Sequence, residues 1–125
     1  MGLDLYVSEH TYKGLNDKKQ PVHEVVELDN FRGCHEIVNE LDLDNCTSKF
    51  FNGDELYTCL NSLKRKLDNV DNMIFYHECT DEEKELQKQR CKIDYKTAID
   101  ALEGFLEENK VADDDTRTFE VHAWW

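Results

Sequence analysis

The run His77-Glu78-Cys79 places a histidine and a cysteine two residues apart, as in one half of a metal site. A structural zinc site usually has two such close pairs, each with ligands about two to four residues apart. The sequence has no second pair, so the fold would have to bring in separate residues such as Cys91 or His35. An ordinary loop explains the run better than half of a zinc site, and we predict no metal and no other cofactor.

Cys34 lies next to His35, and this combination could supply a thiol and its base. Adjacent residues of a helix point about 100° apart, so the two side chains would not meet. We therefore interpret Cys34 as a small core residue and His35 as a partly exposed helix residue. His122 is expected on a strand, half exposed beside Trp124. Because the sequence also lacks a Gly-rich phosphate loop, a G-x-S-x-G elbow and an H-E-x-x-H motif, it favours a protein that is not an enzyme.

Alternating apolar residues predict a strand at each end of the chain. These residues are Leu3, Leu5 and Val7 at the start, and Phe119, Val121 and Ala123 at the end. A period of two is typical of a strand with one buried face. We expect the two terminal strands to be neighbours in one sheet. Residues 11–21 are predicted to form a loop, because they contain Gly, Asn and the only proline, and residues 22–27 to form a short edge strand.

Three helices are predicted between these strands. The first covers residues 31–41, with Asn30 as its N-cap. The second follows an N-cap at Asp54, and its apolar stripe is Leu56, Leu60, Leu63 and Leu67. The third opens with a capping box between Thr80 and Glu83 and extends to about Asn109. Its apolar residues are Leu86, Ile93, Ile99, Leu102 and Leu106, and its polar first turns should be largely solvated.

Residues 1–125 are therefore predicted to form a single small α+β domain, with about three helices packed on a short, mainly antiparallel sheet that includes both terminal strands. The five cysteines are odd in number and widely spaced, which is typical of free thiols in a reducing compartment. No secretory signal pattern opens the chain, and no apolar run approaches the about 18 residues that a membrane span needs. We expect a cytoplasmic protein without membrane association.

Negative charge is the most informative feature of the composition. The chain has 28 Asp and Glu against 15 Lys and Arg, a net charge of −13. A balance this negative disfavours direct binding of nucleic acid, which requires a basic face. The acidic excess lies in residues 1–62 and 99–125, whereas the intervening residues are balanced.

If the terminal strands are adjacent, the two acidic segments could merge into one partner-binding surface. The residues of this predicted surface are Glu36, Glu40, Asp42, Asp44, Glu103, Glu107, Glu108, Asp113, Asp114 and Asp115. Like charges four residues apart destabilise a helix by about a few tenths of a kcal/mol. Such a surface therefore has either no specific role or a role in binding. A solvated acidic face that maintains solubility is the simpler explanation. The functional one is docking on a basic, nucleic-acid-binding groove of another protein.

The chain resembles a group of small proteins of tailed phages and prophages. The resemblance is carried by the opening Met1-Gly2-Leu3-Asp4-Leu5-Tyr6, a central helix beginning Asn30-Phe31-Arg32, and the ending Phe119 to Trp125, an aromatic strand that finishes in Trp. It implies a phage accessory protein that works in the bacterial cytoplasm. The central helix has Gly33, His35 and Val38 where the group tends to have Lys, Asn and His, and we transfer no functional residue from the group.

Our leading hypothesis is a non-enzymatic, acidic inhibitor of a host nucleic-acid-handling defence system, such as a CRISPR effector or a restriction enzyme, partly by mimicry of phosphate charge. Its partner would be a host nucleic-acid-binding protein or ribonucleoprotein. Two alternatives stay open. One is a small metal-dependent or thiol enzyme that uses His35, His77 or His122 with Cys79. The other is a structural, homo-oligomeric phage protein that associates through Trp124 and Trp125.

Overall fold

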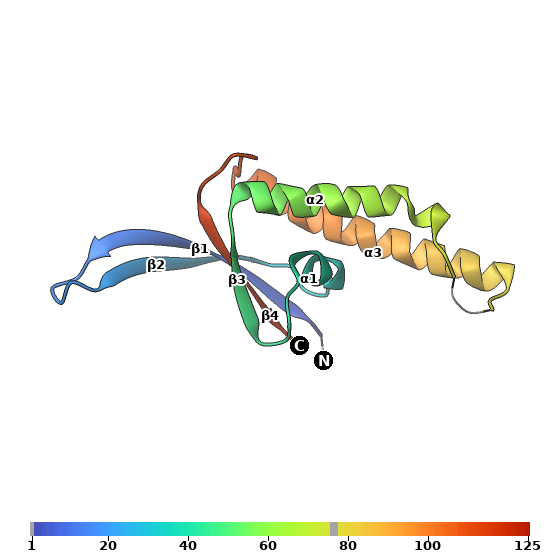
Figure 1. Ribbon diagram of the computed structural model, residues 1–125, viewed down its shortest axis with the longest axis horizontal. Helices are drawn as coiled ribbons and strands as arrows, with labels where there is room; N and C mark the ends of the chain where they lie inside the picture. The colour runs from blue at the N-terminus through green and yellow to red at the C-terminus, as the bar shows by residue number, and fades with distance from the viewer. Residues whose placement is uncertain (1, 76–77) are drawn as a thin grey trace.

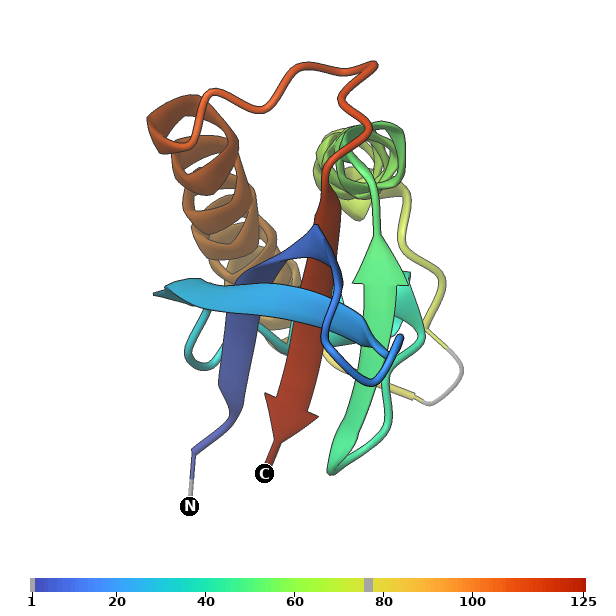
Figure 2. The same cartoon turned by 90° about the vertical axis from the view of Figure 1, so that its left-hand side faces the viewer.

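Four antiparallel strands form one sheet, and the helices cover one of its faces (Figures 1 and 2). The computed structural model describes residues 2–75 and 78–125. In chain order, the elements are β1 (Asp4–Leu15), β2 (Pro21–Asn30), α1 (His35–Leu41), β3 (Thr47–Phe51), α2 (Gly53–Asp68), the 3-10 turn η1 (Val70–Asn72), α3 (Asp81–Glu108) and β4 (Thr118–Trp124). The strand order is β2-β1-β4-β3. The prediction of a single α+β domain is confirmed.

The two ends of the chain pair with each other at the centre of this sheet. β1 is antiparallel to β4, with Leu5 opposite Ala123 and Val7 opposite Val121. These four side chains are buried against the helices, as the alternating pattern predicted. The residues between them point to the other face of the sheet, because successive strand side chains alternate.

The helix pair α2 and α3 closes the core. Leu56, Leu60 and Leu63 on α2 are buried, as the stripe predicted. Phe105 of α3 lies between Phe31 and Phe119, and its ring centroid is 5.5 Å and 5.7 Å from theirs in edge-on contacts. The first half of α3 contributes little to the core, because Leu86 and Ile93 are exposed. They were expected on its apolar side.

The helix starts match their capping signals with two corrections. Thr80 is the N-cap of α3 and accepts the backbone N–H of Glu83, which is one of the two hydrogen bonds of the predicted capping box. The N-cap of α2 is Asn52, not Asp54, and Asn52 forms a capping box with Glu55. The first predicted helix, over residues 31–41, is too long, since α1 begins at His35. Asn30 belongs to β2, and its side chain accepts the backbone N–H of Leu5 instead of capping a helix.

β1 and β2 continue beyond the sheet as a two-stranded arm, residues 11–24. β1 pairs with β4 only as far as His10, but its pairing with β2 reaches Leu15. In Figure 1 the arm projects away from the helices, and in Figure 2 it crosses in front of the other strands. The predicted loop over residues 11–21 is therefore mostly wrong. Its glycine, Gly14, adopts a φ of +94° at a register shift inside β1, where a side chain would be strained.

β3 is the strand that the sequence pattern does not predict. Its five residues alternate poorly, because it is an edge strand with none of its residues fully buried. It pairs with β4, and Phe50 lies opposite Glu120.

Two glycines in the helix pair should respond in opposite ways to alanine. A Cβ on Gly53 would lie 2.5 Å from the carbonyl oxygen of Ala112, whereas a Cβ on Gly104 would meet nothing within 4 Å. We expect Gly53→Ala to lower the free energy of unfolding by about 1–3 kcal/mol. Gly104→Ala, in the interior of α3, should raise it by up to about 1 kcal/mol. Urea denaturation of both variants checks this, and equal effects would contradict the close packing of α2 on the 109–117 loop.

Candidate functional site

The ten predicted carboxylates do not form one surface. Glu36, Glu40, Asp42 and Asp44 belong to α1 and the loop after it, whereas the other six belong to the end of α3 and the 109–117 loop. β3 leads from the first region to the second, and its five residues span roughly 16 Å. In Figures 1 and 2 the 109–117 loop lies at the top of the sheet, whereas α1 lies lower, on the side of the sheet that the helices cover.

Two residues of the first group are held in ion pairs. Glu40 is mostly buried and paired with Lys66 of α2. Burial alone would raise the pKa of Glu40, but hydrogen bonds from Lys66 and Ser62 outweigh it and hold the pKa below its usual range. Asp42 lies 3.7 Å from the Lys49 ammonium. Glu36 and Asp44 have no ion pair among the described residues.

Two residues of the second group are also paired. Glu103 binds Lys64 across the helix pair, with 2.9 Å between carboxylate and ammonium. Asp115 binds Arg117 at 2.8 Å. The hydrogen bond from the Arg117 side chain lowers the pKa of Asp115 to about 2. Four of the ten predicted contact residues thus have structural partners of their own.

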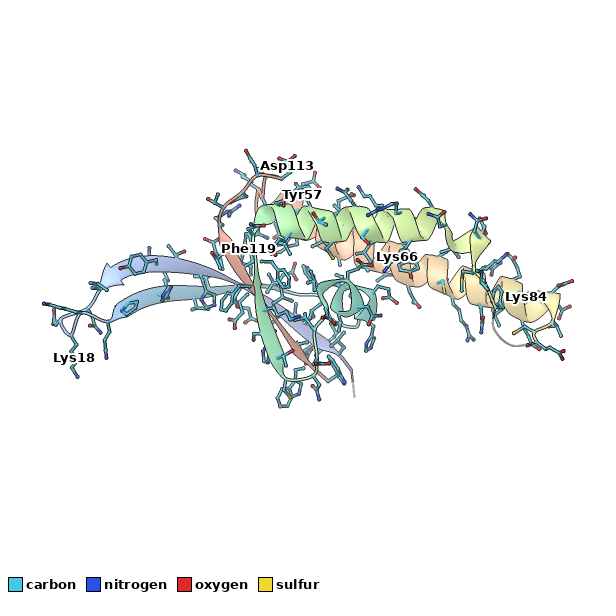
Figure 3. The ribbon with its side chains drawn as sticks, in the orientation of Figure 1. Lys18, Tyr57, Lys66, Lys84, Asp113 and Phe119 are labelled. Atoms are coloured by element: carbon cyan, nitrogen blue, oxygen red, sulfur yellow. The ribbon has the colours of Figure 1, made fainter. Side chains whose placement is uncertain are left out.

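The remaining carboxylates of the second group lie along one end of the molecule, together with one that sequence reasoning missed. This acidic end consists of Asp54, Glu107, Glu108, Asp113 and Asp114. All five are exposed, and none has an ion pair among the described residues. Figure 3 shows Asp113 beside the start of α2, well away from Lys66 near its other end. The backbone N–H of Gly53 donates to the carbonyl of Asp115 at 2.9 Å, and this contact brings Asp54 to the loop.

Arg117 holds the acidic end to the sheet. Its guanidinium donates to both oxygens of Asp115, to the carbonyls of Asn109 and Lys110 and, at 3.3 Å, to the carboxylate of Glu9 on β1. One cation therefore ties together the end of α3, the loop and the first strand. The carboxylates beside this anchor are on a fixed framework.

The positions of Glu107 and Glu108 lower the stability of α3. They occupy the last turn of α3, which contains no basic residue. The C-terminus of a helix carries partial negative charge, so carboxylates there are unfavourable by about 0.3–1 kcal/mol each. Glu107 also shares a helix face with Glu103, four residues earlier.

The open face of the sheet contains a second feature, a pocket in the angle between the arm and β3. It has a volume of about 420 Å³ and is lined by His10, Tyr12, His23, Phe50 and Thr118. We call it the arm pocket. None of its lining residues was predicted as a site residue. With residues 11–21 predicted as a loop and β3 not predicted, nothing in the sequence indicated that these side chains share one face of a sheet.

A chain of polar contacts lies on the same face. His10 Nε2 is 2.8 Å from Glu120 Oε1, and Ser48 Oγ is 2.6 Å from His122 Nδ1. The hydrogen bond to His10 holds the pKa of Glu120 below its usual range. His122 is partly buried, as predicted, and Trp124 beside it is exposed.

The residues proposed for metal or thiol chemistry do not form a metal site among the described residues. His77 lies outside the described residues. Within the part of the chain that the structure describes, no group of three or more His, Cys, Asp or Glu side chains is arranged to hold a metal ion. Cys34 is buried in the core and His35 is exposed, which confirms those two interpretations. Burial raises the pKa of the Cys59 thiol to about 12. Burial also raises the pKa of the Cys34 thiol above its usual value, so neither cysteine supplies a thiolate at neutral pH.

Residues 2–75 and 78–125 also contain no helix with both the length and the apolar character needed to cross a membrane.

The Asp115–Arg117 pair should make the free energy of unfolding depend on pH in the acidic range. Because the pKa of Asp115 is lowered in the folded chain from 3.8 to about 2, its contribution is complete above about pH 5 and is lost as the pH falls toward 2. Asp115→Asn should be less stable at neutral pH and lose less stability between about pH 5 and 2. Asp113→Asn, which removes an exposed neighbour without an ion pair, is the control. Parallel pH profiles for D115N and the parent chain, measured by chemical denaturation, would contradict the pairing.

No family model, curated protein or solved structure matches the chain.

Proposed function

We propose that this chain is a non-enzymatic accessory protein of a phage or prophage that inhibits a host nucleic-acid-handling protein, of the CRISPR effector or restriction type. The acidic end would dock on the basic surface that normally holds nucleic acid. The resemblance of the opening, the central helix and the aromatic ending supports the phage origin and the bacterial cytoplasm in this proposal. The positions of the exposed carboxylates support the choice of docking surface.

The observation that carries the proposal is the clustering of five exposed carboxylates without ion pairs among the described residues, two of which, Glu107 and Glu108, lie at a helix end that disfavours them. Carboxylates are expected at the N-terminus of a helix and lysines at its C-terminus. In α3 the last turn has Glu107 and Glu108, and the following loop adds Asp113 and Asp114. An arrangement that lowers the stability of the chain in isolation is a candidate for a role in a complex.

The physics of such a complex is electrostatic. Opposite potentials accelerate the encounter of two surfaces and exclude partners of the same charge. Carboxylates on the acidic end would occupy the basic groove in place of phosphates. Because the charges are exposed, salt should screen them, with a Debye length of about 8 Å at physiological ionic strength.

The α1 group is left out of this surface. Glu40 is committed to Lys66, and Asp42 lies beside Lys49. Replacing Glu40 by Lys would place two ammonium groups against each other in a half-buried position and would destabilise the fold. The partner-binding residues proposed are therefore the acidic end, without the α1 carboxylates and the paired Glu103 and Asp115.

Reversing the charges at the end of α3 should stabilise the isolated chain. Glu107→Lys with Glu108→Lys places cations at the helix C-terminus, and we expect the free energy of unfolding to rise by about 0.5–2 kcal/mol. The control is Glu85→Lys with Asp94→Lys, two exposed positions away from the last turn of the same helix. Thermal denaturation at low salt compares the two pairs. If the first pair destabilises the chain, these glutamates have stabilising partners and their role in docking loses its support.

The same reversal, extended along the acidic end, should abolish partner binding. The variant combines Glu107→Lys, Glu108→Lys, Asp113→Lys and Asp114→Lys, and its host partner is captured on the parent chain at low salt. The matched control reverses the same number of exposed carboxylates elsewhere, at Asp17, Asp68, Glu85 and Asp94. We expect the first variant to weaken binding by more than about 100-fold and the second by less than about 10-fold.

Equal loss in both four-site variants would mean that net charge alone mediates binding. An affinity that does not change between about 50 and 500 mM salt would exclude the electrostatic mechanism. Circular dichroism of each variant separates lost binding from lost folding.

A further inference from the structure

The arm pocket is a concave corner built from residues of all four strands. Tyr12 of β1 lies opposite His23 of β2 on the arm, and His10 lies where the arm leaves the sheet, opposite Thr118 of β4. Phe50 of β3 forms the other wall. Tyr12 and Phe50 are each more than half exposed, at 59% and 55%. Large rings left in water on two sides of a hollow form a surface that a ligand can cover.

The rings are inclined to one another instead of being stacked. His10 and Phe50 are 5.0 Å apart between centroids at 89°, and Tyr12 and His23 are 5.7 Å apart at 57°. The centroids of His10 and His23 are 6.5 Å apart at 55°. In an edge-on pair the edge of one ring covers part of the face of the other, and the exposed area of Tyr12 and Phe50 is the ring surface that a ligand can still contact. A cation within about 6 Å of a ring centroid is attracted by the negative face of the ring.

The charge around the pocket also favours a cation. Glu120 lies opposite Phe50 and is hydrogen-bonded to His10, so its carboxylate adjoins two pocket residues. The lysine next to Tyr12 in sequence, Lys13, is neutralised by Glu24 at 3.1 Å. The chain as a whole carries a net charge of −13.

Among protein side chains, arginine fits these features best. Its guanidinium is flat, so it can stack on a ring while its N–H groups donate in the plane of the stack. The Thr118 hydroxyl in the pocket lining and the adjoining Glu120 carboxylate can accept hydrogen bonds from a guanidinium. A lysine ammonium is compact and strongly hydrated and would use the rings less well.

We propose that the arm pocket is a socket for an arginine side chain of the partner protein. The inference rests on the proposed function, which calls for a partner with a basic surface, and names a residue type on that surface. The acidic end would supply long-range attraction, and the pocket would receive one side chain at short range. The arm, which projects from the sheet, would then have a purpose as the outer wall of the socket.

A short peptide tests the pocket without the host partner. The probe is acetyl-Gly-Arg-Gly-amide, and its match is the same peptide with citrulline, which keeps the shape of arginine but has no charge. Amide chemical shifts of the full chain are followed by NMR during titration. We expect the arginine peptide to shift the resonances of residues 10, 12, 23, 50 and 118 in a saturable way at millimolar concentration, and the citrulline peptide to bind at least about 10-fold more weakly.

Two ring deletions and one control locate the site. Tyr12→Leu and Phe50→Leu should each weaken binding of the arginine peptide by roughly 3- to 30-fold. Tyr6→Leu removes a ring from the same strand and the same face of the sheet, but outside the pocket, and should change the affinity by less than about 2-fold.

Several results would overturn the inference: no saturable shift up to about 50 mM peptide, equal binding of the citrulline peptide, or equal effects of Tyr6→Leu and Tyr12→Leu. Comparing the peptide titration with the host-partner experiment on the four-site reversal of the acidic end separates the two proposals. If that variant loses the host partner but the parent chain never binds the peptide, the proposed function stands and the socket fails. If the parent chain binds the peptide but the acidic end has no effect on the host partner, the socket stands alone.

Discussion

The pairing of the first strand with the last is the constraint on which the rest of the structure depends. With β1 and β4 at the centre of the sheet, Leu5, Val7 and Val121 face the helices, and every second residue faces away. The buried face closes a core with α2 and α3. The helices do not cover the other face of the sheet. Beyond its pairing with β4, β1 continues with β2 into the arm. Both candidate binding features are consequences of this pairing, because the arm pocket lies on the open face and the loop that carries the acidic end leads directly into β4.

The acidic end and the arm pocket contribute different forces. Exposed carboxylates act over a Debye length and tolerate many arrangements of positive charge in a partner. The pocket acts only in contact, through inclined rings at fixed spacing. Arg117 links the two, since it anchors the 109–117 loop to Glu9 on the strand that also carries His10 and Tyr12. A surface that combines diffuse attraction with one specific contact discriminates among basic partners better than charge alone.

Periodicity was sufficient for the parts of the fold that bury a continuous face. The alternation at Leu5 and Val7 predicted a strand, and the stripe on α2 predicted a helix. β3 and the arm could not be predicted in this way, because neither buries a regular face and Gly14 and Pro21 are typical of loops. For the candidate site, the composition located the acidic segments, but it did not show which carboxylates form ion pairs and which stay exposed. Whether Glu40 meets Lys66 depends on how α1 packs on α2, and no spacing along the chain contains that information.

The most direct measurement for the central claim is a competition between this chain and nucleic acid for the host partner. The partner is loaded with a fluorescent duplex, and the anisotropy of the duplex is followed as the chain is added at low salt. If the acidic end occupies the phosphate-binding groove, the duplex is released with one chain per site, and the midpoint shifts to higher chain concentration as duplex is added. A ternary complex, in which the chain binds while the anisotropy of the duplex stays high, would contradict phosphate mimicry.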